Sequence, residues 1–242
     1  MLKYRQIERK CQLKMVFVTG DTHAQINSKK LFDFAKTHKN LTKNDYVIVL
    51  GDFGFIFYPN PDNAKEKYQI KELEKLPYSI LFIDGNHDCH SRLNSYPIEI
   101  WNGGKIHRIN DSIFHLMRGQ VFNIQGKTFF TMGGAQSYDR IYRTEGFDWW
   151  REEVPSHNEV NEMIVNANKV RNVDYILTHT CTTDMIPYLI EQSNMYDPTN
   201  SILDELNKIL TYNHWYFGHW HKDIINIDEK HSCLFNKIIQ LI

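Results

Sequence analysis

The sequence feature that most constrains the fold is a repeated pattern in which a short apolar run ends at side chains able to bind a metal or move a proton. Five such runs cover residues 15–19, 46–50, 79–83, 173–177 and 215–217. The polar residues that follow these runs are Asp21 and His23, then Asp52, then Asn86 to Asp88, then His179, and finally His219 and His221. Ligands of open α/β sheets bind beyond the carboxyl ends of the strands. We therefore expect these side chains to gather at one edge of a sheet.

The first half of the chain alternates strands with helices. Amphipathic or charged segments at residues 28–39 and 62–75 predict helices between the first three strands. The order strand, helix, strand, helix, strand is typical of right-handed βαβ units and a parallel sheet.

From residue 105 the pattern changes to short strands separated by turn residues. These strands are expected at 106–109, 113–117, 121–124 and 128–132. Such spacing is typical of antiparallel hairpins, and we expect it to begin a second sheet.

The C-terminal part of the sequence, from about residue 156, predicts further helices and a terminal hairpin. Ser156 and Glu159 form a capping-box pattern before a helix at 157–170, and more helices are expected near 182–192 and 199–210. Residues 222–242 read as a hairpin with its turn near Asp228. The fold class expected from these elements is α/β, with two mixed sheets packed face to face and helices outside.

We expect one domain over residues 15–242, preceded by a polar extension over 1–14. Met15 stands where a shorter chain would start. Residues 137–156 have neither helical nor strand period and contain adjacent tryptophans together with Arg140 and Arg143. A long irregular segment inside a compact domain is usually functional, so we interpret it as an insert near the site.

Composition and charge limit the classes of partner and the cellular location that we expect. The 242 residues carry a formal net charge of -1, which gives no general reason to expect an extended nucleic-acid or membrane binder. No apolar run is long enough to cross a membrane, and the first fourteen residues lack the apolar core of a secretory signal. The four cysteines include no CxxC pair, a usage typical of a reducing compartment, so we expect a cytoplasmic location.

The polar residues at the strand ends form a mixed ligand set. They comprise three oxygen donors and four imidazoles: Asp21, His23, Asp52, Asn86, His179, His219 and His221. Such a set suits Mn, Fe, Co, Ni or Zn, and the lack of thiolates argues against a structural zinc site. Seven side chains are too many for one ion but suit two that share a carboxylate. Two ions about 3.5–4 Å apart can hold a hydroxide and clamp both the attacking and the leaving oxygen of a phosphoryl transfer.

At this point the sequence resembles the calcineurin-like metallophosphoesterases. Their motifs stand here, in family order, as Asp21-Thr22-His23, Gly51-Asp52, Gly85-Asn86-His87-Asp88, His179 and Gly218-His219-Trp220-His221. The resemblance covers about residues 15–222 and implies a four-layer αββα sandwich with two divalent ions, Mn²⁺ above all.

The resemblance also implies a role for each matched residue. One ion would take Asp21, His23, Asp52 and His221, and the other would take Asp52, Asn86, His179 and His219. His87 would be the catalytic group, either a general acid toward the leaving oxygen or a donor to the phosphoryl group. A histidine beside the ions but not bound to them can transfer a proton near neutral pH.

One departure from the family bears on the substrate. The protein phosphatase branch carries a second aspartate three residues after the GD aspartate, where this chain has Phe55. Support for His87 would then come from Asp84 or Asp88, or be absent. This favours the phosphodiesterases and small-molecule phosphatases over the protein phosphatases.

The expected activity is hydrolysis of a phosphate ester, with a diester of a nucleotide or of a nucleic-acid end as the leading substrate. The alternatives are a phosphomonoesterase, a non-catalytic scaffold and a processive nuclease. Arg140 and Arg143 are candidate substrate contacts, because a guanidinium binds phosphate with two hydrogen bonds. The oligomeric state is left open.

Overall fold

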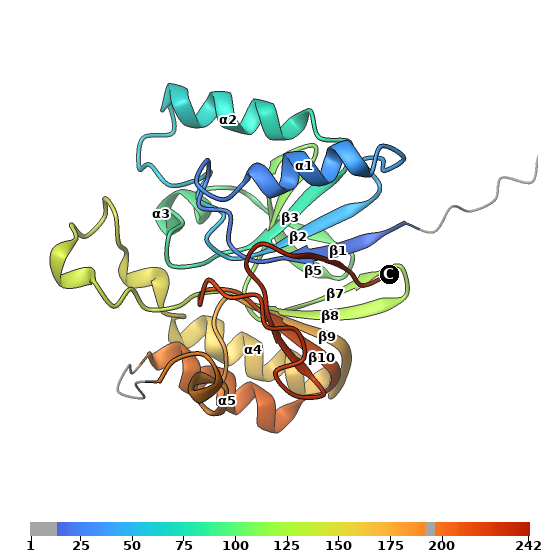
Figure 1. Ribbon diagram of the computed structural model, residues 1–242. Helices are drawn as coiled ribbons and strands as arrows, with labels where there is room; N and C mark the ends of the chain where they lie inside the picture. Colours follow the sequence, from blue (N-terminus) through green and yellow to red (C-terminus); the bar gives the residue numbers. More distant parts are fainter. Residues whose placement is uncertain (1–13, 192–196) are drawn as a thin grey trace, which may run out of the picture.

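The computed structural model describes residues 14–191 and 197–242, so the expected extension lies almost wholly outside the described residues. Two sheets pack face to face between helices, and Figure 1 shows α1, α2 and α3 over one sheet and α4 and α5 over the other. This is the expected four-layer α/β sandwich.

The first sheet has seven strands in the order β12-β1-β2-β3-β6-β5-β4. Its strands are β1 (Val16–Thr19), β2 (Tyr46–Leu50), β3 (Ser79–Ile83), β4 (Ile98–Trp101), β5 (Gly104–Asn110), β6 (Ile113–Leu116) and β12 (Ile238–Gln240). The neighbours β1, β2, β3 and β6 run parallel, as the βαβ pattern predicted.

The second sheet has five strands in the order β11-β10-β9-β8-β7. These are β7 (Gln120–Ile124), β8 (Lys127–Met132), β9 (Asn172–Thr178), β10 (Thr211–Phe217) and β11 (His231–Cys233). Only the β7–β8 pair is antiparallel, so this sheet is mixed as well.

Four of the five described α-helices lie close to their predicted positions, whereas the short α3 was not predicted. The five helices are α1 (Lys29–Thr37), α2 (Ala64–Glu74), α3 (His90–Leu93), α4 (His157–Val170) and α5 (Pro198–Ile209). The predicted capping box begins α4, since the Ser156 side chain accepts from the Glu159 N–H and the Glu159 carboxylate accepts from the Ser156 N–H.

The apolar strands are buried on both faces because each side chain faces one of two apolar layers. In β1, Val16 and Val18 point into the layer between the sheets, while Phe17 points toward α1. In β2, Ile48 points into the layer between the sheets and Val47 points toward the helices. Continuous burial explains why these strands read as unbroken apolar runs rather than as alternating ones.

One expectation about the sheets was wrong. The hairpin at 106–117 does not begin the second sheet: its strands β5 and β6 extend the first, where β6 pairs with β3, and the second sheet begins at β7.

The helix expected near 182–192 is shorter than predicted. It is a 3₁₀ helix over Thr183–Tyr188 that contains Pro187, and residue 192 lies outside the described residues.

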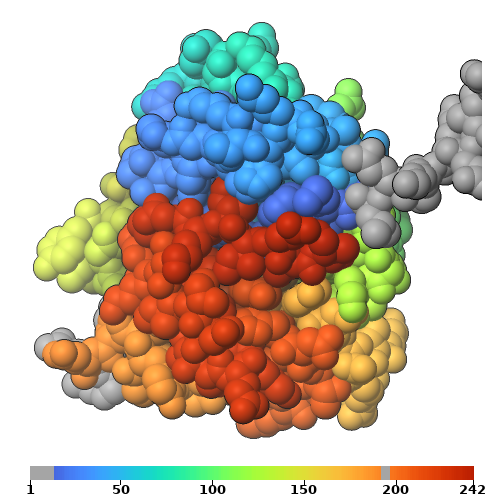
Figure 2. Space-filling model, turned by 45° about the vertical axis from the view of Figure 1, so that its right-hand side comes forward, coloured from blue at the N-terminus to red at the C-terminus, as the bar shows by residue number. Residues whose placement is uncertain are grey.

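The C-terminal segment forms part of the expected hairpin: Ile224 and Cys233 pair as an antiparallel bridge on either side of the turn near Asp228, but β12 does not take part in it. β11 pairs with β10 in the second sheet, whereas β12 pairs antiparallel with β1 in the first. Figure 2 shows this red segment lying across the molecule, between the blue N-terminal residues and the orange residues of the second half. The tail therefore ties the two sheets together.

The segment between β8 and α4 is irregular, as predicted for residues 137–156. It holds two short 3₁₀ turns (Arg140–Tyr142 and Arg151–Glu153) and protrudes from the body of the protein in Figure 1. Within the described residues, no helix has the length and apolar character needed to span a membrane.

Candidate metal centre

The predicted ligands meet because the parallel strands end in register. β1 and β2 are aligned with Thr19 opposite Val49, and β2 and β3 with Leu50 opposite Ile83. In the other sheet Thr178 of β9 lies opposite Phe217 of β10. The loops after all five strands thus open at the same end of the sandwich.

The two glycines nearest the carboxylates are required by close packing. A Cβ atom at Gly85 would lie 2.2 Å from the Asp52 carboxylate, and one at Gly218 would lie 2.3 Å from the Asp21 carboxylate. The GN and GH pairs of the sequence therefore reflect backbones that approach the buried carboxylates directly, whereas Gly51 of the second GD pair packs against the His179 ring.

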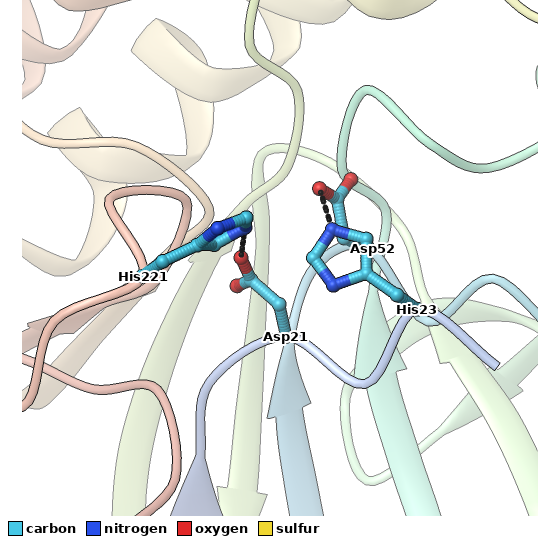
Figure 3. Close-up of side chains that lie close together, drawn as sticks. All are labelled: Asp21, His23, Asp52 and His221. Carbon is cyan, nitrogen blue, oxygen red and sulfur yellow. Dashed lines mark ion pairs between the residues drawn. The ribbon is translucent and has the colours of Figure 1, made fainter. Parts of the chain in front are cut away.

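One group of ligand atoms consists of Asp21, His23, Asp52 and His221, shown in Figure 3, and these atoms all lie within 4.8 Å of one another. Nε2 of His23 is 3.1 Å from Asp52 Oδ2, and Nε2 of His221 is 3.2 Å from Asp21 Oδ2. Both carboxylates are buried, with at most 1% of their surface exposed.

A second group consists of Asp52, His179 and His219. Nε2 of His179 lies 3.3 Å from Asp52 Oδ1 and 3.1 Å from Asn86 Oδ1, which brings the amide into the same group. Asp52 belongs to both groups, which is the position expected of a shared carboxylate.

The residues present fit divalent metal ions. Within residues 14–191 and 197–242, His23 Nδ1 is buried without a hydrogen bond, and Asp21 Oδ2 has an ion-pair contact with His221 but no well-oriented hydrogen bond, although buried polar atoms normally form one. Nδ1 of His179 donates to the Leu50 carbonyl at 2.8 Å, which leaves Nε2 facing the carboxylate and the amide, as is usual for a metal-binding histidine.

The backbone conformation of four candidate ligands also indicates a functional site. His23, Asp52, His219 and His221 all have positive φ, between 43° and 65°. Non-glycine residues in this region are uncommon and cluster at functional sites, where the surrounding structure holds them.

Burial and close contact between charged groups shift the pKa values of the side chains in the centre. Burial by itself would lower the pKa of His179, but the facing carboxylates of Asp52 and Asp21 outweigh it and raise this pKa to about 10. Burial and the charge of His179 lower the pKa of His219 to about 3. Burial opposes ionisation of Asp52, yet the neighbouring histidines keep its pKa well below the ordinary value.

His87 lies beside the centre without entering either group of ligand atoms. Its backbone N–H donates to Asp52 Oδ1 at 2.7 Å, and its Nδ1 faces Nη1 of Arg143 at 3.4 Å. Burial and the Arg143 charge lower the pKa of His87, against the opposing effect of Asp52. The imidazole is therefore largely neutral near pH 7.

Neither aspartate considered as a support for His87 contacts it. The Asp88 carboxylate accepts from the backbone N–H groups of Phe53, Gly54 and Gly85, so it fixes the two loops that carry Asp52 and Asn86. The Asp84 carboxylate points away and accepts from His115 Nε2 at 3.0 Å and from the Arg118 guanidinium at 2.6 and 2.8 Å.

The Arg118 pair is the feature that sequence reasoning missed. The guanidinium is buried and also donates to the Glu152 carbonyl at 2.8 Å, which ties the end of β3 to the insert. Ser137 was missed too, although its hydroxyl accepts from the Asn86 amide at 3.1 Å. No local pattern marks either residue, since both act through partners distant in the chain.

The two candidate arginines differ in position. Arg143 lines a cavity of about 170 Å³ over the ligands, together with Asn86, His87 and His219, and it is held by a two-hydrogen-bond pair with Asp139. Arg140 instead donates to Gln136 and lines a different cavity with Trp149 and Trp150.

Comparison with known proteins agrees with this geometry. The sequence model of the family described as calcineurin-like phosphoesterase matches residues 15–223, and a search of curated proteins finds no match. The matched range contains all seven candidate ligands and His87. The family and the cluster of ligand side chains together support metal-dependent hydrolysis of a phosphate ester. The chain belongs to the calcineurin-like phosphoesterase family.

Proposed function

We propose that this protein is a dinuclear metal-dependent phosphodiesterase acting on a nucleotide or on a nucleic-acid end. The observation that carries the proposal is the position of Asp52 in both groups of ligand atoms. Asp21, His23, Asp52 and His221 would hold one ion, and Asp52, Asn86, His179 and His219 the other. Mn²⁺ is the proposed ion for this nitrogen and oxygen set, with Fe, Co, Ni and Zn as alternatives. The ions would activate water and neutralise phosphate charge.

His87 acts as a hydrogen-bond donor in this proposal. Arg143 has only N–H donors, so Nδ1 of His87 acts as the acceptor in their contact, and the proton of the neutral ring resides on Nε2. Nε2–H would then donate a hydrogen bond to a phosphoryl oxygen or to the leaving oxygen, where negative charge develops.

Arg143 would contact the phosphoryl group from its place beside His87 in the same cavity. Its pair with Asp139 and its hydrogen bond to the Asp148 carbonyl at 3.0 Å hold the guanidinium in place before substrate arrives. A guanidinium held in this way matches the charge of a phosphate without further ordering.

The preference for a diester rests on two features. Phe55, at the place of the second aspartate of protein phosphatases, is only 2% exposed and packs against Phe53. Phe57 and Tyr58 lie half-buried beside the centre, where a base could stack. A phosphomonoesterase is the alternative. We also propose a cytoplasmic location, since Cys89, Cys181 and Cys233 are buried free thiols.

The proposal is tested by the hydrolysis of bis(p-nitrophenyl) phosphate and of p-nitrophenyl phosphate, after chelation and after addition of Mn²⁺. We expect Mn²⁺-dependent cleavage of the diester in preference to the monoester. Cleavage of the monoester alone would establish the phosphatase alternative, and inactivity toward both, and toward a panel of nucleotide diesters, would refute the proposal.

Replacement of His87 tests the hydrogen bond that it would donate. His87→Ala should lower kcat for the diester by about 10²–10³-fold, the range for loss of one donor to a developing charge, while the Mn²⁺ content stays unchanged. The matched control is His157→Ala at the exposed start of α4, which should retain full activity. Loss of bound Mn²⁺ in His87→Ala would instead make His87 part of the metal site.

A further inference from the structure

A second cavity adjoins the candidate metal centre, with a volume of about 390 Å³. His23 and His87 form its wall on the side of the centre, and Phe57, Tyr58 and Gln69 lie among its other lining residues. His87 also lines the smaller cavity over the ligands, so a single imidazole faces both spaces. The volume falls in the range of small-molecule sites, roughly 300–1,000 Å³.

The aromatic wall of this cavity is fixed by buried charges. The Glu66 carboxylate accepts from the backbone N–H groups of Phe57 and Tyr58 at 3.3 and 3.2 Å, and it is paired with Arg92. Arg92 in turn donates to the Tyr58 carbonyl at 2.8 Å. The Phe57 ring also packs edge-on against Trp150 at 5.6 Å. A wall held in this way binds a flat ligand without first being ordered.

Other aromatic residues near the centre are not available for this role. Trp150 and Phe55 are 3% and 2% exposed, so their faces are already covered by protein, and Trp149 lines a different cavity. Phe57 and Tyr58 remain as the aromatic surface open to a ligand on this side of His87.

Two polar side chains of α2 lie on the same side of the helix and line the cavity. Gln69 is 5% exposed, yet within residues 14–191 and 197–242 its side-chain amide forms no hydrogen bond. Lys65, one turn earlier, likewise forms no ion pair with a described residue. The cavity therefore offers an aromatic surface, a free donor and acceptor, and a cation.

We propose that this cavity binds a nucleoside as the leaving half of the ester, an inference that rests on the proposed phosphodiesterase function. The base would stack on Phe57 and Tyr58 and bond through its polar edge to the Gln69 amide. Water supplies the oxygen that bonds to phosphorus, and the bond from phosphorus to the nucleoside oxygen breaks. The departing oxygen accepts a hydrogen bond from His87 Nε2–H and takes up the proton that the attacking water releases. The cavity thus lies on the side of His87 to which the leaving oxygen departs.

Binding is measured first, on the full chain with and without Mn²⁺. Calorimetric titration with adenosine and uridine should show saturable binding, while ribose should show none. Phe57→Ala should weaken nucleoside binding about tenfold, within the range expected for one base stacked on an aromatic ring. Tyr68→Ala is the control for removal of an aromatic side chain, since Tyr68 lies on α2 next to Gln69, is 61% exposed and is outside the cavity lining.

Turnover is measured second, on two diesters of one nucleotide. A dinucleoside monophosphate should be cleaved with a kcat/KM about tenfold above that of the nucleotide methyl ester, and this ratio should fall toward one in Phe57→Ala and in Gln69→Leu. Equal kcat/KM for both esters, together with no nucleoside binding, would overturn the cavity assignment but leave the phosphodiesterase standing. If no ester is cleaved, the phosphodiesterase fails, and the titration alone decides whether the cavity binds nucleosides.

Discussion

Asp52→Asn should reduce Mn²⁺-dependent diester hydrolysis to the level of the metal-free protein. Asp52 is the one carboxylate in both groups of ligand atoms, and its replacement removes a negative charge from two ion sites at once. Loss of a residue that merely orients a ligand already costs about 10–100-fold in metal affinity or activity, so loss of this ligand should cost more than 100-fold. The measurement is the diester rate beside the number of Mn²⁺ ions bound per chain.

The expected loss in Asp52→Asn needs a control for a general effect of removing a carboxylate. Asp62→Asn serves, because Asp62 is exposed at the start of α2 and is paired only with Lys67 at the surface. Full activity and two bound ions are expected in this control. A fully active Asp52→Asn protein would refute the shared site.

Arg118→Met should destabilise the fold by about 3–5 kcal/mol, the usual cost of leaving one buried charge without its partner. The Asp84 carboxylate is 1% exposed and takes two hydrogen bonds from the guanidinium, which would be lost. The insert would also lose its bond from Arg118 to the Glu152 carbonyl. Urea unfolding measures the change in the free energy of unfolding.

The destabilisation should depend on pH with a definite sign. Burial opposes ionisation of Asp84, but Arg118 and the adjacent histidines hold its pKa well below the ordinary value. A carboxylate with a lowered folded-state pKa contributes stability above its unfolded pKa, about 3.9, and loses that contribution as the pH falls. The difference between wild type and Arg118→Met should therefore be full at pH 7 and shrink below about pH 4.

A matched control is available at the surface. Arg151→Met removes an arginine whose pair with Glu145 is largely exposed, and such pairs contribute about 0–1 kcal/mol. The double variant Asp84→Leu with Arg118→Met should recover much of the lost stability, since no charge is left unpaired. If Arg118→Met were no less stable than Arg151→Met, the buried pair would not hold the insert.

The sequence predicts the parallel strands and the place of the centre well, because both depend on local patterns. Runs such as Val47 to Leu50 are apolar throughout, and a strand of this kind must be covered on both faces. Once the strands are parallel, their ends meet, and Asp21, Asp52 and His179 come together as a consequence. The glycines before the aspartates add a local signal for a close backbone approach.

The errors concern pairings that no local pattern specifies. The hairpin of β5 and β6 was recognised, but its place depends on the contact between Ile113 and Ile80, far apart in the chain. The sequence correctly predicts the turn near Asp228, which the Ile224–Cys233 bridge closes, but β12 lies beyond this hairpin and pairs with the edge of β1. For the same reason the sequence did not reveal the contact between Arg118 and Asp84.

The central claim is that two divalent ions, held through Asp52, are needed for the reaction. It is tested most directly by titrating the metal-free protein with Mn²⁺ while bound ions and the rate on bis(p-nitrophenyl) phosphate are followed together. The account predicts two ions per chain, with the full rate reached only when the second has bound. Turnover that persists after complete removal of metal, or no saturable binding of Mn²⁺, Fe²⁺, Co²⁺, Ni²⁺ or Zn²⁺, would contradict it.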